Sequence, residues 1–189
     1  MTDKVLKSII DALNRHLKVR WSVGQREDKV VLTCLVNQDG SVPPDNANKI
    51  ICSIVNFEQE KVHSYGSFTT AGNGLKNPPV NLDLYLMFSS AYQGESKNYT
   101  EGLRLLSHVI GFFQARQVFN SRNTPGFPPA VQKLTFNMFN VDLGNLSNLW
   151  GALGAKYMPS VIYQVRMVTI FEDMLSDEIG DIRGINTST

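Results

Sequence analysis

The 189-residue sequence is short of the residues from which enzymes most often build active sites. It contains three histidines and two cysteines, and no two of these residues have the spacing of metal ligands. It also lacks a G-x-S-x-G turn, a phosphate-binding loop and a dinucleotide-binding glycine motif. We therefore predict no catalytic residue, no metal site and no cofactor, and hence a protein that is not an enzyme. A small enzyme whose site is dispersed along the chain is the less favoured alternative.

An excess of charge of one sign and a long apolar run are missing as well. The 18 Lys and Arg residues almost balance the 17 Asp and Glu residues, which gives a formal net charge of +1. Nucleic acid binding through phosphate neutralisation needs a concentrated basic surface. No stretch reaches the roughly 18 apolar residues of a membrane helix, and the first 20 residues lack the apolar region of a signal peptide. We expect neither nucleic acid nor a membrane as a partner.

The two cysteines, Cys34 and Cys52, both lie in apolar stretches rich in β-branched residues. Such stretches are typical of strands. We therefore expect both residues to be buried free thiols rather than partners in a disulfide.

What is present is a regular alternation of helical and strand patterns. Apolar residues recur at helical spacing over 3–19 and 100–116, and a short helix or turn is indicated over 143–153. Strand patterns occupy 29–36, 49–60, 80–92 and 132–141, and a last strand lies within 153–171. The polar, glycine-rich stretch 61–79 is a long loop or a loose hairpin. This order predicts an α+β fold, with a mostly antiparallel sheet flanked by helices that lie on one of its faces.

Two of the strands have faces of different character. In 80–92 the residues from Leu82 to Phe88 alternate, so that the leucines point one way while Tyr85 and Asp83 point the other. In the last strand, Gln164 and Arg166 interrupt an otherwise apolar second face. A mixed face of this kind meets either water or a neighbouring subunit, so a protein that holds other proteins is favoured over an active-site floor.

Several stretches together carry a resemblance to a known family. They are NPPVNLDLYLMFSSAY with YTEGLRLLSHVIGFFQ, and FNSRNTPGFPP with KLTFNMFNVDLGNLSNLWGALGAKYMPSVIYQVRMVTI, together with the amphipathic N-terminal helix. They resemble the tail terminator, or cap, proteins of bacterial contractile injection systems of the antifeeding prophage and Photorhabdus virulence cassette type. The resemblance covers about residues 1–172 and is most specific in LSNLWGALGAKYMPSVIYQVRMV.

The resemblance implies a structural protein with a phage tail-terminator-like fold. Such a protein forms a ring, expected to be a hexamer, that ends the polymerisation of the inner tube and the sheath and joins the two. Its partners would be the tube and sheath proteins of the same particle. It would assemble in the bacterial cytoplasm and sit at the distal end of the particle. A phage tail-completion or adaptor protein is the alternative within the same structural class.

The resemblance also bears on domain organisation. Some members of the family carry a further C-terminal domain, and we expect this chain to be a short form. Residues 1–172 would form a single α+β domain, and residues 173–189 an acidic, flexible tail.

Six residues are predicted to contact partners, on the basis of their place in loops and mixed strand faces and of their aromatic character. They are Tyr65, Phe68, Tyr85, Trp150, Tyr157 and Arg166.

Overall fold

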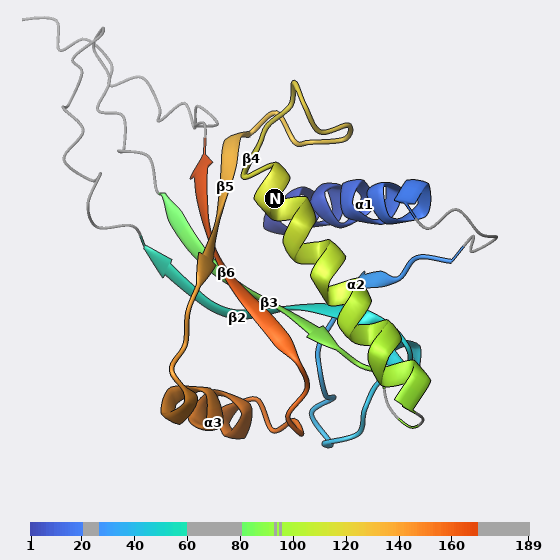
Figure 1. Cartoon of the computed structure of the whole chain (residues 1–189). Helices are drawn as coiled ribbons and strands as arrows, with labels where there is room; N and C mark the ends of the chain where they lie inside the picture. Colours follow the sequence, from blue (N-terminus) through green and yellow to red (C-terminus); the bar gives the residue numbers. More distant parts are fainter. Residues whose placement is uncertain (21–26, 60–80, 93, 95, 170–189) are drawn as a thin grey trace, which may run out of the picture.

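The computed structural model describes residues 1–20, 27–59, 81–92, 94 and 96–169 (Figure 1). Within these residues there are three α-helices, a short 3-10 helix and six strands. In chain order they are α1 (Thr2–Arg20), β1 (Val30–Leu32), the 3-10 helix (Pro44–Asn46), β2 (Ile50–Gln59), β3 (Leu82–Ser90), α2 (Ser96–Ala115), β4 (Val118–Phe119), β5 (Val131–Phe139), α3 (Leu143–Ala152) and β6 (Ser160–Thr169).

The six strands form one sheet in the order β1-β2-β3-β6-β5-β4. β1 runs parallel to β2, and every other neighbouring pair is antiparallel. The prediction of an α+β fold with a mostly antiparallel sheet is therefore confirmed. The last described strand, β6, lies in the middle of the sheet between β3 and β5. Its side chains therefore contribute to both faces of the sheet at its centre.

Helices α1 and α2 cover one face of the sheet, which we call the first face (Figure 1). The apolar stripe of α1 is buried, as is that of α2, where Phe112 and Phe113 lie among the strands' side chains. Phe113 stacks on Phe136 of β5, with ring centroids 4.3 Å apart, and lies 4.9 Å from the ring of Tyr163 in β6. This aromatic cluster joins α2 to the centre of the sheet.

Helix α3 lies on the opposite, second face, at the end of the sheet drawn lowest in Figure 1. Its buried side chain, Trp150, belongs to a separate cluster with Met87 and Ile162 of the sheet. The expectation that all helices lie on one face is therefore wrong. The second faces of β3 and β6 are apolar at this end, so a helix must cover them. The apolar pattern of a helix shows which of its own sides is buried, but it does not show on which face of the sheet the helix packs.

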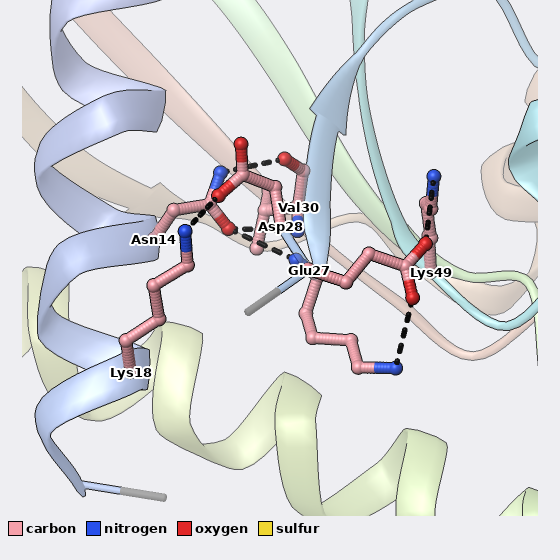
Figure 2. A network of polar contacts seen from close by, with 7 residues as sticks. Asn14, Lys18, Glu27, Asp28, Val30 and Lys49 are labelled. Carbon is pink, nitrogen blue, oxygen red and sulfur yellow. Dashed lines mark hydrogen bonds and ion pairs between the residues drawn. The ribbon is translucent and has the colours of Figure 1, made fainter. Parts of the chain in front are cut away.

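Asparagine side chains occupy the outer edges of the two edge strands. Asn14 of α1 donates to the Val30 carbonyl at 2.8 Å and accepts from the Lys29 and Val30 amides at 3.1 and 3.0 Å (Figure 2). At the other edge, Asn123 donates to the Val118 carbonyl at 2.9 Å and accepts from the Asn120 amide. Each side-chain amide thus makes the hydrogen bonds of an additional strand.

Ion pairs support the Asn14 contact from both sides (Figure 2). Lys18 of α1 lies 2.7 Å from Asp28, and Glu27 lies between Lys29 at 3.8 Å and Lys49 at 3.3 Å. These pairs are at least partly exposed, so each contributes less than about 1 kcal/mol. The Lys18–Asp28 pair holds the entry to β1 against α1, and the Glu27–Lys49 pair holds it against the start of β2.

The expectation of two buried thiols holds for one cysteine and is wrong for the other. Cys52 in β2 is fully buried, whereas Cys34 is exposed, because β1 ends at Leu32 instead of continuing through the predicted stretch 29–36. The two-residue strand β4 was not predicted, since a strand of that length has no detectable period. The predicted long loop 61–79 and the predicted acidic tail 173–189 lie outside the described residues.

Candidate partner-binding surface

The second face of the sheet is covered by α3 at one end and by no described helix at the other. The uncovered part, here called the open half-face, is made by Glu58, Asp83, Tyr85, Phe139, Gln164 and Arg166. The strand register brings them together, because Asp83 lies opposite Arg166, and Tyr85 opposite Gln164. Glu58 of β2 lies opposite Asp83 on the other side. Residues from four different strands therefore form one continuous surface.

A buried carboxylate lies at the centre of this surface. Asp83 has only 7% of its surface exposed. It accepts a hydrogen bond from the Gln164 amide at 3.0 Å and lies 3.8 Å from Nε of Arg166. Its Oδ1 accepts no hydrogen bond within the described part of the chain. This oxygen is itself buried, so Asp83 fixes the positions of Gln164 and Arg166, which are the groups of this site that a docked partner can reach.

Tyr85 connects the polar and the aromatic parts of the open half-face. Its hydroxyl donates to Glu58 at 3.2 Å, and its ring meets that of Phe139 edge to face, with centroids 5.1 Å apart. Burial and the hydrogen bond to Glu58 both raise the pKa of the Tyr85 hydroxyl. The hydroxyl therefore stays protonated at neutral pH. Phe139 is 41% exposed, which gives the surface an apolar anchor.

The second predicted aromatic pair lies at α3. Asp142 begins the helix by accepting a hydrogen bond from the Asn145 amide, and the helix then places Trp150 against the sheet. Trp150 is 4% exposed, whereas Tyr157 is 65% exposed and meets the indole edge to face at 5.7 Å. Trp150 is therefore a core residue that supports Tyr157, and Tyr157 is the member of the pair that a partner could contact.

The structure thus brings four of the six predicted contact residues to the second face of the sheet. Tyr85 and Arg166 belong to the open half-face, and Trp150 and Tyr157 lie beside the end covered by α3. Tyr65 and Phe68 lie outside the described residues, so their role stays a prediction.

The sequence analysis did not include Asp83, Glu58 or Phe139 among the contact residues. Their grouping depends on which strands are neighbours. The placement of β6 between β3 and β5 is a long-range property, and no local pattern in the sequence indicates it. The alternation within β3 did place Asp83 on the same face as Tyr85.

The chemistry of this surface suits recognition. Among the residues that the structure describes, no three His, Cys, Asp or Glu side chains are placed to hold a metal ion. The carboxylate of Asp83 faces an amide and a guanidinium, which hold it in place. In the described part of the chain, no helix is long and apolar enough to cross a membrane.

Solved structures with a similar fold come from contractile injection systems. One is described as the sheath/tube terminator of an extracellular contractile injection system, PVC, in the extended state. It is 15% identical, with a TM-score of 0.53, and the match covers 100% of this chain and 64% of that one. A second is the tube-terminating cap of the anti-feeding prophage. It is 12% identical, with a TM-score of 0.51, and the match covers 96% of this chain and 60% of that one.

At these identities the likeness establishes the fold, and the chain spans less than two thirds of the length of either relative. A search of curated proteins finds no match. The sequence itself matches the Pvc16 N-terminal domain family over residues 4–182, which is nearly the whole chain. The chain therefore belongs to the Pvc16 N-terminal domain family.

Proposed function

We propose that this chain is a structural cap of a phage-tail-like contractile injection system. In this role it forms a six-fold ring at the distal end of the particle, ends the polymerisation of the inner tube and the sheath, and joins the two. It carries out no catalysis, and it assembles in the bacterial cytoplasm. The observation that carries the proposal is the family match over residues 4–182, together with a fold shared with a sheath/tube terminator and a tube-terminating cap.

The open half-face supports the same role. A ring of identical subunits needs heterologous contacts, in which one surface of a subunit meets a different surface of the next. The open half-face combines an exposed aromatic anchor, Phe139, with the buried carboxylate of Asp83 and the partly exposed Arg166. This combination of an apolar anchor and directional polar groups is typical of protein–protein interfaces. We infer that it contacts a neighbouring ring subunit or the tube.

The first test is the mass of the purified protein by light scattering over a concentration series, followed by negative-stain imaging. Rings of six chain masses support the proposal. The second part mixes the protein with purified tube and sheath of the same particle, since a cap can close its ring on a tube end. Failure to bind either one, by a protein that also forms no ring, contradicts the proposal and favours an adaptor in another kind of tail.

A matched pair of variants tests whether the second face makes the contact. Tyr157→Ala removes a ring that is 65% exposed beside α3, and Tyr99→Ala removes a 49% exposed ring from α2, the helix that covers the first face. Neither change opens a core cavity. We expect Tyr157→Ala to weaken binding to tube ends about tenfold or more, as for an interface aromatic residue. Tyr99→Ala should bind like the unchanged protein, and equal losses in both variants would argue against a second-face contact.

A further inference from the structure

A groove lies on the first face of the sheet, away from the open half-face. Its volume is about 310 Å³, and its lining residues come from α2, the link between α2 and β4, β5 and β6: Ile110, Phe113, Gln114, Gln117, Phe136, Met138 and Tyr163. Met138 is 50% exposed although it points to the same face as the buried Leu134 and Phe136. The apolar face of β5 therefore continues beyond the part that α2 covers.

Tyr163 gives this groove an unused polar atom. The residue is 2% exposed, yet its hydroxyl has no hydrogen-bond partner among the residues that the structure describes. Burial raises the pKa of the hydroxyl to about 12, so it stays protonated and is a donor at neutral pH. A buried hydroxyl without a partner is unfavourable, and a ligand in the groove that offers an acceptor would remove this penalty.

The groove runs beside a free stretch of sheet edge. β4 is only two residues long and pairs with Leu134 and Thr135 of β5. The Phe136 amide donates to the Gln117 carbonyl at 2.8 Å, so the backbone groups of Phe136 point away from β6. By the alternation of an antiparallel ladder, the amide and carbonyl of Met138 point the same way. The residues that precede Gln117 belong to α2, which ends at Ala115. No described strand therefore pairs with Met138 on that side.

The outer edges of β1 and β4 are engaged by asparagine side chains, whereas residues 54–59 of β2, beyond its pairing with β1, have no described strand partner on that side. Asn14 holds both backbone groups of Val30 on β1, and Asn123 holds the carbonyl of Val118 on β4. β1 has only three residues, so little of its edge remains. The groove lies beside β5, so in this strand an outward-facing backbone edge adjoins a pocket for a side chain.

We propose that the outer edge of β5 at Met138 and the adjoining groove receive an extended peptide segment of a partner protein, which adds to the sheet as a strand. The backbone of the segment pairs with Met138, one apolar side chain enters the groove, and a carbonyl or side-chain oxygen accepts a hydrogen bond from Tyr163. Strand addition supplies affinity through main-chain hydrogen bonds and specificity through the pocket beside the edge.

The lining restricts the chemistry of the partner. None of the seven lining residues is charged, and the polar ones are two glutamines and the tyrosine. A phosphate or a carboxylate would find no counter-charge there, whereas an uncharged segment with a valine-sized or leucine-sized side chain matches the walls. The contact is also small. It is far below the about 1,600 Å² of a standard stable interface, so it should secure a partner that is held elsewhere as well.

The test uses the full chain and a synthetic peptide of alternating threonine and valine with blocked ends, followed by amide NMR. Binding should perturb residues 136–139 of β5 and residues 110–117, at the end of α2 and the link to β4, in a saturable way. A twin peptide with N-methylated backbone amides cannot form the ladder and should not bind. No perturbation at millimolar peptide, or perturbation at β1 instead, overturns the proposal. The proposal is also overturned if the amide signal of Met138 shifts with protein concentration in the absence of peptide, because a second copy of the chain would then occupy the edge.

Variants separate the two elements of the site. Met138→Pro removes the outward amide without removing a bond to β6, and it should abolish binding, whereas Met138→Ala keeps the amide and should weaken binding less. Tyr163→Phe keeps the packing and should weaken binding about three- to tenfold. In the free protein it should leave the melting temperature unchanged or raise it, since an unpaired buried hydroxyl is lost. Equal binding by Tyr163→Phe and the unchanged protein removes the hydroxyl from the proposal. The cap function does not depend on any of these outcomes.

Discussion

Two glycines of α2 offer a sharp test of the packing described above. Gly102 is buried where α2 crosses β3, and a Cβ atom there would lie 2.3 Å from Oγ of Ser90 and 2.7 Å from Cβ of Tyr92. Gly111 is exposed in the same helix, and a Cβ atom there would meet nothing within 4 Å. The same substitution, glycine to alanine, should therefore have opposite effects at the two positions.

The magnitudes follow from two terms. Alanine is favoured over glycine in a helix interior by about 0.8–1 kcal/mol, and this gain applies to both variants. At Gly102 the Ser90 hydroxyl can rotate away, but Cβ of Tyr92 is tied to the backbone, so the helix must move outward by about 1 Å to reach an ordinary contact distance. Overpacking of this kind costs about 1–3 kcal/mol or more. We expect Gly111→Ala to stabilise by about 0.5–1 kcal/mol and Gly102→Ala to destabilise by up to about 2 kcal/mol.

Urea denaturation followed by circular dichroism measures both changes, with the slope of the transition as a check that the unfolded states are comparable. In thermal melts each 1 kcal/mol should shift the midpoint by about 2–4 °C for a chain of this size. Because the helix-propensity term cancels between the two variants, their difference isolates the steric term. If Gly102→Ala is as stable as Gly111→Ala, the close approach of α2 to β3 is absent and the reasoning fails.

Three further predictions concern other parts of the molecule. Asn14→Ala leaves the amides of Lys29 and Val30 and the Val30 carbonyl without their partner, and it should cost about 2–4 kcal/mol in urea denaturation, whereas Asn123→Ala at the exposed β4 edge should cost less than about 1 kcal/mol. Burial, and then the positive charges of Arg20, His108 and Arg116, lower the pKa of His16, whose ring lies 5.1 Å from that of Phe112. The folded state thus binds its proton less readily than the unfolded state, so stability should fall as the pH drops below about 6.5, and His16→Gln should reduce this loss in melts between neutral and acidic pH. Finally, a thiol reagent should label Cys34 in the native protein and Cys52 only after unfolding, because Cys52 is fully buried and burial raises the pKa of its thiol; rapid labelling of both in the native state would contradict the described packing.

The sequence predicted most of the fold because its strong periods are local. The stripe from Val5 to Leu17 identified α1, and the alternation from Leu82 to Phe88 identified β3, since both patterns depend on neighbours along the chain. The placement of α3 on the second face could not be predicted in this way. It depends on Met87 and Ile162 being neighbours in space, which follows from strand order and not from local periodicity.

The candidate surface was predictable to the same extent. The mixed faces of β3 and β6 indicated Tyr85 and Arg166, because alternation shows which side chains share a face within one strand. The pairing of Asp83 with Gln164 and Arg166 joins residues 81 positions or more apart, and it required the register. For Trp150 the residue type alone could not decide between two roles. Its aromatic character suggested a contact with a partner as readily as a core, and its burial between α3 and the sheet decides for the core.

The asparagine contacts at the sheet edges also bear on the solubility of the protein. A sheet protein forms fibres when each copy offers two open edges, so that every addition exposes another site for growth. In the described part of this chain, Asn14 and Asn123 engage the outer edges of β1 and β4, and two stretches have no described strand partner, Met138 of β5 and residues 54–59 of β2. The stretch at Met138 offers one outward amide and one outward carbonyl, and the stretch of β2 is interrupted by a register shift between Ile54 and Asn56 and carries the charged Glu58, so neither is a regular edge of the kind that fibres extend. The cap proposed above would thereby be kept from polymerising through its own sheet edges.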